Sequence, residues 1–143
     1  GALADRALER GVKRLVLLSG RGEDEAQRAE RALQESGADW TIVRCSWFNQ
    51  NFNESFFLEP LAAGELALPA GAVPEPFVDV ADVAVAALTE SGHAGRVHEL
   101  TGPRLLTFSE AVDEIGRAAG RPLRFTEVPM DEYVAAMSGA GVP

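Results

Sequence analysis

Side chains that could bind a ligand are concentrated in one stretch of the sequence, directly after a short apolar run. Residues 40–43 are apolar and β-branched, which is typical of a buried strand. The run then turns polar and aromatic, with Arg44, Cys45, Ser46, Trp47, Phe48, Asn49, Gln50 and Asn51. Ligands of open α/β sheets bind just beyond the carboxyl ends of the strands. The stretch is therefore either the wall of a ligand site or an irregular loop whose amides satisfy their own backbone.

Residue types suited to catalysis lack the spacing that the chemistry needs. Hydride transfer of the short-chain dehydrogenase type uses Tyr and Lys four residues apart, but the only tyrosine is Tyr133 and the only lysine is Lys13. Neither His93 nor His98 comes with a serine on a sharp strand–turn–helix, so a Ser-His-Asp triad is not indicated. No His or Lys lies near Cys45 in the sequence to activate its thiol. We therefore assign no catalytic side chain.

The acidic residues and the glycines also have ordinary explanations. Asp79 and Asp82 resemble a catalytic pair, but capping of the helix that follows accounts for them. The histidines and carboxylates are scattered, so no metal site is predicted. Residues 19–22 (SGRG) have only two glycines, and the acidic run Glu23-Asp24-Glu25 that follows would repel a phosphate. This turn is rejected as a pyrophosphate loop.

The bulk properties set the class of protein. The chain has 143 residues, of which 46% are apolar, and this length favours one domain with a real core. A net charge of −9 argues against binding a nucleic-acid backbone. The sequence contains no run of 18 apolar residues, so no membrane span is predicted. Cys45 has no internal partner for a disulfide, which favours a reducing, cytoplasmic location.

The first part of the chain has the pattern of parallel α/β structure. We predict a helix over 2–10, a strand over 12–18 whose apolar end (15–18) is buried on both faces, a helix over 23–36 and a strand from Trp40. Two strands joined by a crossover helix are parallel, and the crossover is nearly always right-handed. Residues 1–52 are therefore expected to form part of a doubly wound sheet.

The second part, residues 53–143, has a different texture and is predicted to be a separate lobe. We expect a turn-rich link over 69–76 and a capping box from Thr107 to Glu110 that begins a helix ending at Ala119. The other predicted elements are helices over 53–63, 80–90 and 130–137 and strands over 96–100 and 123–128.

Four segments, taken together, resemble a known family. They are GVKRLVLLSG (11–20), ERALQESGADWTIVRCSWFNQNF (30–52), PFVDVADVAVAAL (76–88) and GRVHELTGPRLLTFSEAVDEIGRAAGRPLRFTEV (95–128). In this order they resemble the NmrA-like, or atypical short-chain dehydrogenase/reductase, proteins. The similarity is strongest to the NAD(P)H-dependent quinone oxidoreductase branch, where an aromatic pair follows the strand as Trp47 and Phe48 do here.

The resemblance implies the C-terminal part of a Rossmann-type sheet with a small α+β substrate lobe, and a cofactor that is NADP or NAD. It implies that Ser19 and the segment after the strand contact the nicotinamide half of the cofactor, namely Ser46, Trp47, Phe48, Asn49, Gln50 and Asn51. The aromatic pair and a Phe56–Phe57 helix would wall the pocket. Where many relatives carry a Lys or His that faces the cofactor, this chain has Ala26 or Gln27.

Three functions stay open on this resemblance. The first is an oxidoreductase that reduces a quinone or similar small acceptor. The second is a non-catalytic NAD(P)-sensing regulator with a protein partner, which the Ala26/Gln27 departure favours. The third is a fragment that binds no cofactor, since the family's glycine-rich loop would precede Gly1. A homodimer is a further possibility for the oligomeric state.

Overall fold

The computed structural model describes residues 1–55 and 57–139. Contacts between residues divide the chain into two compact units, each formed by two separate segments. Unit 1 comprises Gly1–Phe48 and Val78–Pro103, and unit 2 comprises Asn49–Phe77 and Arg104–Pro143. Residues 78–103 thus belong with the first part of the chain rather than with the second. The predicted division of function between residues 1–52 and 53–143 stays a prediction.

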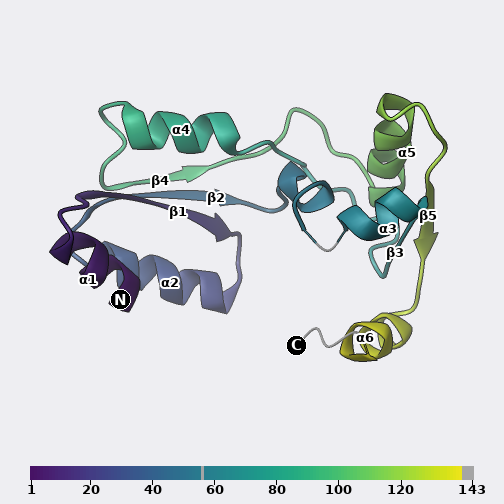
Figure 1. The fold of residues 1–143 in the computed structure, drawn as a ribbon, viewed down its shortest axis with the longest axis horizontal. Coiled ribbons are helices and arrows are strands. Elements are labelled where there is room, and N and C mark those ends of the chain that lie inside the picture. The colour runs from purple at the N-terminus through teal and green to yellow at the C-terminus, as the bar shows by residue number, and fades with distance from the viewer. Residues whose placement is uncertain (56, 140–143) are drawn as a thin grey trace. The chain divides into compact units, whose positions relative to one another are not determined.

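Unit 1 is a parallel sheet with helices on both faces, as the sequence predicted. Its strand order is β1-β2-β4, and both neighbouring pairs are parallel. One face carries α1 and α2, and the opposite face carries α4 (Figure 1). The strands are β1 (Arg14–Gly20), β2 (Asp39–Cys45) and β4 (Arg96–Glu99), and the helices are α1 (Ala2–Glu9), α2 (Asp24–Gln34) and α4 (Ala81–Thr89).

Burial in unit 1 is greatest in β2, the central strand. Thr41, Ile42 and Val43 are each 0% exposed, because a neighbouring strand lies on either side and helices cover both faces. The prediction that residues 15–18 of β1 are buried on both faces is wrong. Residues 15–17 are half-buried and Leu18 is 46% exposed. Among the described residues β1 pairs with β2 alone, so its outer edge has no neighbouring strand.

Unit 2 contains a two-stranded parallel sheet that includes one strand missed from the sequence, β3. A four-residue strand such as ELAL gives too short an alternation to separate it from the turn-rich link that follows. The elements are η1 (Asn49–Phe52), α3 (Leu58–Ala63), β3 (Glu65–Leu68), α5 (Phe108–Ala118), β5 (Arg124–Glu127) and α6 (Met130–Gly139).

The helix predicted over 53–63 begins later, at Leu58. Pro60 explains the difference, since proline has no N–H and is tolerated only in the first turn of a helix. A helix that began at Asn53 would place Pro60 in its interior. The late start puts Pro60 in the first turn, and the helix ends at Gly64, whose φ of 105° suits a residue without a Cβ.

Aromatic rings form the core of unit 2. The ring centroids of Phe52 and Phe77 are 5.4 Å apart, and Phe77 meets Phe108 edge-on at 5.2 Å. Phe57 is 3% exposed and packs on Phe52 at 6.1 Å. It is thus a core residue rather than the open pocket wall that was predicted, whereas Phe56 lies outside the described residues.

None of the helices within 1–55 and 57–139 is long and apolar enough to cross a membrane.

The capping box predicted at the start of α5 is confirmed. The Thr107 hydroxyl accepts from the Glu110 N–H at 3.2 Å, and the Thr107 N–H donates to the Glu110 carboxylate at 2.8 Å.

We expect Thr107→Ala to lower the free energy of unfolding by about 1 kcal/mol, because an N-terminal N–H of the helix loses its acceptor. Urea denaturation measures this change. Thr107→Ser should restore most of the loss, and Ser109→Ala, at an exposed position of the same turn, should change little. Equal losses from Thr107→Ala and Ser109→Ala would contradict the capping role.

Candidate functional site

The polar residues at the ends of the unit 1 strands lie side by side. In the parallel register Ser19 is opposite Arg44, and Arg44 is opposite Glu99. Three side chains that are far apart in the sequence are therefore aligned across the carboxyl edge of the sheet. This is the edge where open α/β sheets bind ligands.

A buried carboxylate from α2 joins this row. Glu30 is 4% exposed and accepts three hydrogen bonds. The Ser19 hydroxyl donates to its Oε1 at 2.5 Å, and Arg44 donates to both oxygens, from Nε at 3.0 Å and from Nη2 at 2.6 Å. The bonds from Arg44 are the main cause that lowers the pKa of the Glu30 carboxyl below its usual value, and burial opposes them. Glu30 is therefore a charged, fully paired group beneath the sheet edge.

The same network continues toward solvent. The Arg44 Nη1 donates to Glu99 Oε1 at 2.5 Å, and Arg21 Nη2 lies 3.0 Å from Glu99 Oε2. The bonds to Glu30 and Glu99 together raise the pKa of Arg44 above its usual value. We call Ser19, Arg21, Glu30, Arg44 and Glu99 the strand-end cluster. It links α2, the ends of β1 and β2, and β4.

Glu30 is a residue that sequence reasoning missed. It lies in a strongly charged segment, which predicts a solvated helix face. A signal was nevertheless present, since Glu30 is four residues after Ala26 and three before Leu33, and this spacing places all three on one face of a helix. Ala26 is half-buried and Leu33 is 8% exposed, so that face packs against the sheet. A carboxylate in such a stripe indicates a partner elsewhere in the fold.

The residues predicted to contact a nicotinamide are distributed over both units. Ser19 is 3% exposed, with its hydroxyl hydrogen engaged by Glu30. Ser46, Trp47 and Phe48 are half-buried and leave the end of β2 in unit 1. The backbone there is fixed, because the Val78 N–H donates to the Trp47 carbonyl at 3.2 Å. Asn49, Gln50 and Asn51 form the 3-10 turn η1 of unit 2, where the Ser55 hydroxyl donates to the Asn51 carbonyl at 2.6 Å. The assignment of these residues to a cofactor stays a prediction.

The other residues considered for catalysis have structural partners. Burial raises the pKa of the Cys45 thiol to about 11, so it is protonated at neutral pH. Asp79 accepts a bond from the Ala81 N–H at 2.8 Å, at the start of α4. His93 Nδ1 and His98 Nε2 are 3.1 Å apart, a contact that the sequence did not predict because it connects a loop to β4. Within the described ranges no three His, Cys, Asp or Glu side chains are grouped to hold a metal ion.

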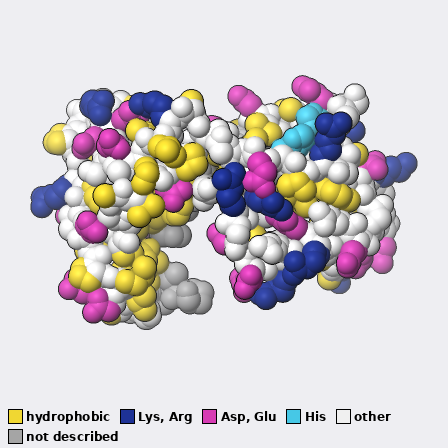
Figure 2. Space-filling model, turned by 180° about the vertical axis from the view of Figure 1, so that it is seen from behind, with side chains coloured by type: hydrophobic (Ala, Val, Ile, Leu, Met, Phe, Trp, Pro, Cys, Tyr) yellow, Lys and Arg dark blue, Asp and Glu magenta, His cyan; other side chains and the backbone are white. Residues whose placement is uncertain are grey.

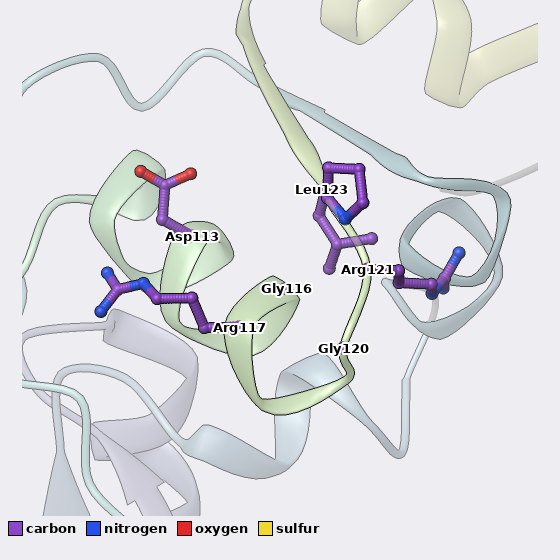
Figure 3. A pocket seen from close by; sticks show the side chains of 7 residues that line it. Asp113, Gly116, Arg117, Gly120, Arg121 and Leu123 are labelled. Atoms are coloured by element: carbon purple, nitrogen blue, oxygen red, sulfur yellow. The ribbon is translucent and has the colours of Figure 1, made fainter.

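Two cavities have linings that include no residue of the strand-end cluster. In unit 2 a groove of about 440 Å³ has Asp113 and Arg117 of α5 on one side and Leu123 on the other (Figure 3). Arg121, which also lines it, donates to the Leu61 and Ala62 carbonyls at 2.8 and 3.0 Å and so ties this loop to the end of α3. The second cavity, about 310 Å³, is mainly apolar and is lined by residues of α1, α2 and β1. Neither contains a nucleophile beside a base.

Charges are mixed on the face of the molecule that Figure 2 draws. Figure 2 shows Lys and Arg side chains interspersed with Asp and Glu rather than gathered into one large basic patch.

Comparisons with known proteins find reductases among the relatives of this chain. No protein-family model matches the chain. It is 32% identical to an NAD(P)H azoreductase of Xenophilus azovorans over 99% of this chain and 54% of the relative. It is 37% identical to a (4-alkanoyl-5-oxo-2,5-dihydrofuran-3-yl)methyl phosphate reductase of Streptomyces griseus over 90% of this chain and 50% of the relative. The chain thus spans about half the length of the relatives that it matches.

Solved structures give the same result. An NADPH-dependent quinone oxidoreductase from Escherichia coli superposes with a TM-score of 0.71 at 26% identity, over 99% of this chain and 55% of that protein. That enzyme has also been solved in complex with NADPH. The comparison confirms the predicted Rossmann-type α/β fold.

The buried Glu30 makes a pH-dependent contribution to stability. Its pKa is lowered on folding, so the stabilisation is fully present above the pKa of an unfolded glutamate, about 4.3, and is lost as the pH falls through the folded value. We expect Glu30→Gln to lower the free energy of unfolding by about 1–3 kcal/mol at pH 7, and the difference from wild type to shrink below about pH 4. Urea titrations between pH 3 and pH 7 (roughly the range of carboxylate titration) measure it.

Glu114→Gln is the matched control for this prediction. Glu114 forms a bidentate pair with Arg104 at 2.9 and 3.0 Å, but on the surface, so its removal should matter much less. Similar losses from both substitutions would contradict a special role for the buried pair.

Proposed function

We propose that this chain belongs to an NADP(H)-dependent oxidoreductase. The premise is that it is related to the C-terminal part of the NmrA-like, or atypical short-chain dehydrogenase/reductase, proteins. The acceptor would be a quinone or a similar small conjugated molecule. The observation that carries the proposal is the polar and aromatic segment leaving β2 at the carboxyl edge of a parallel sheet, in a fold that superposes on an NADPH-dependent quinone oxidoreductase.

The residues at this edge fit the nicotinamide end of the cofactor. Trp47 and Phe48 are half-buried and can offer apolar surface to a flat ring, while Ser46 can offer a hydroxyl to a carboxamide. The phosphates do not fit here, since the Glu23 carboxylate covers Gly20, with an oxygen 2.7 Å from where a Cβ would lie. When bound, the nicotinamide supplies the hydride. The chain's own contribution is then to orient the ring and to exclude water from it.

A second candidate is a non-catalytic sensor of NADP(H) or NAD(H). The specific observation is that Ala26 and Gln27, where the family resemblance implies a Lys or His facing the cofactor, are half-buried and uncharged. Neither can provide the same electrostatic interaction with a cofactor. A regulatory protein partner belongs to this candidate, whereas a homodimer and a cytoplasmic location are compatible with both.

Turnover separates the two candidates. We expect the full-length protein to oxidise NADPH in the presence of a soluble benzoquinone, because the nicotinamide carries the hydride chemistry and needs only positioning. The loss of nicotinamide absorbance measures the rate, with protein-free and quinone-free mixtures as controls. Tight NADPH binding without oxidation would favour the sensor. Absence of both binding and oxidation would contradict both candidates.

Asn51 provides a residue-level test of the proposed wall. If its amide contacts the cofactor, Asn51→Ala should weaken NADPH binding by about 1–3 kcal/mol, the loss of one or two polar contacts. Fluorescence titration with NADPH measures the affinity. Asn53→Ala is the control, since Asn53 is exposed and only two residues further along. Unchanged affinity together with lowered stability would show that Asn51 only fixes the turn.

A further inference from the structure

The buried ion pair in the strand-end cluster needs an explanation beyond stability. Removing two charges from water is costly, and well-packed apolar residues often stabilise a fold as much as a buried pair does. Here Glu30 is 4% exposed, yet it carries a full charge at neutral pH. What such a pair offers that apolar residues do not is directional hydrogen bonding, which fixes the orientation of the groups around it.

The geometry of the cluster fixes side chains at the proposed site. Because Glu30 accepts the Ser19 hydrogen at 2.5 Å, the Ser19 hydroxyl is held in one rotamer and its oxygen retains only lone pairs for another partner. Arg44 is held at three nitrogens, with Nε and Nη2 on Glu30 and Nη1 on Glu99. Neither side chain can reorient without breaking a charge-assisted bond.

The same pair anchors the backbone from which the aromatic segment leaves. Arg44 lies two residues before Ser46. Its carbonyl accepts from the Leu100 N–H at 2.8 Å, and the Cys45 carbonyl accepts from the Arg21 N–H at 3.0 Å. The end of β2 is therefore tied to both neighbouring strands by its backbone and to α2 by the Arg44 side chain.

We propose that Glu30 and Arg44 are positioning residues for the site at the strand ends. Their buried pair sets the Ser19 rotamer and the exit direction of residues 46–48, and so aligns the surface that receives the nicotinamide. This inference rests on the proposed function. It assigns Glu30 and Arg44 no contact with the cofactor, since they act through Ser19 and through the segment after β2.

Steady-state kinetics of the full-length protein test the proposal. Glu30→Gln removes the charge, and Arg44→Lys keeps the charge but loses the bidentate geometry. Each should raise KM for NADPH about tenfold, with a smaller change in kcat, because the ring meets a misaligned surface. Glu114→Gln, which alters an exposed bidentate pair, should leave KM and kcat unchanged.

The split between KM and kcat distinguishes positioning from a merely structural role. Loss of folded protein lowers the apparent kcat and leaves KM unchanged, provided that the assay temperature is well below unfolding. Variants with wild-type KM would overturn the proposal, even if their stability were reduced. Arg44→Lys should raise KM for NADPH as much as Glu30→Gln does. A wild-type KM in the Arg44→Lys variant would show that the positive charge alone is sufficient, and this result would also overturn the proposal.

If the wild-type protein does not oxidise NADPH, the proposed function is contradicted but the positioning role of Glu30 and Arg44 is not. A second measurement then tests that positioning role. In a Trp40→Phe background of the 143-residue chain, Trp47 is the only tryptophan. We expect acrylamide to quench the Trp47 emission more strongly in the Glu30→Gln variant than in the background protein, because the segment after β2 loses its anchor. The Glu114→Gln variant should be quenched to the same extent as the background protein. Unchanged quenching after Glu30→Gln would then overturn the positioning role.

Discussion

The carboxylate of Glu30 imposes the main constraint on unit 1. A charged group that is 4% exposed is tolerated only when its oxygens are paired, and three donors meet it. Those donors come from the ends of β1 and β2, and Arg44 passes the connection on to Glu99 of β4. The helix that crosses between the first two strands is thereby fixed at the same edge as all three strands. This interaction is located at the carboxyl ends of the strands.

Local patterns were sufficient for most of the elements. The strand–helix–strand order of the first part follows from short apolar runs that alternate with an amphipathic helix, and such a crossover dictates parallel pairing. The start of α5 follows from Thr107 and Glu110, whose spacing is a local capping signal. Where local signals conflicted, the outcome depended on a single residue. Pro60 delayed the start of α3 against an apolar pattern that favoured an earlier one.

The candidate site was only partly predictable, because its key contacts are tertiary. The polar segment after β2 is visible in the sequence, but the pairing of Glu30 with Arg44 joins residues 14 apart on different elements. Ser19 was predicted as a direct contact of the cofactor. In the structure its hydroxyl hydrogen is already engaged, and this could be seen only once α2 was placed against the sheet. Phe57 was assigned to a pocket wall from its type, whereas packing placed it in the aromatic core of unit 2. Residue type gives chemistry, but exposure depends on the fold.

Under the proposed function, the charges at the strand ends would favour one end of a dinucleotide over the other. Arg21 and Arg44 are both paired with carboxylates, Glu30 and Glu99, so neither offers a free guanidinium to a phosphate. Glu23 adds a further negative charge beside Gly20. A phosphate would meet net repulsion here, whereas a nicotinamide ring is neutral when reduced and cationic when oxidised. Under the proposed function, an edge with a slight excess of negative charge would not repel the neutral reduced ring, and it would attract the cationic oxidised ring that remains after hydride transfer.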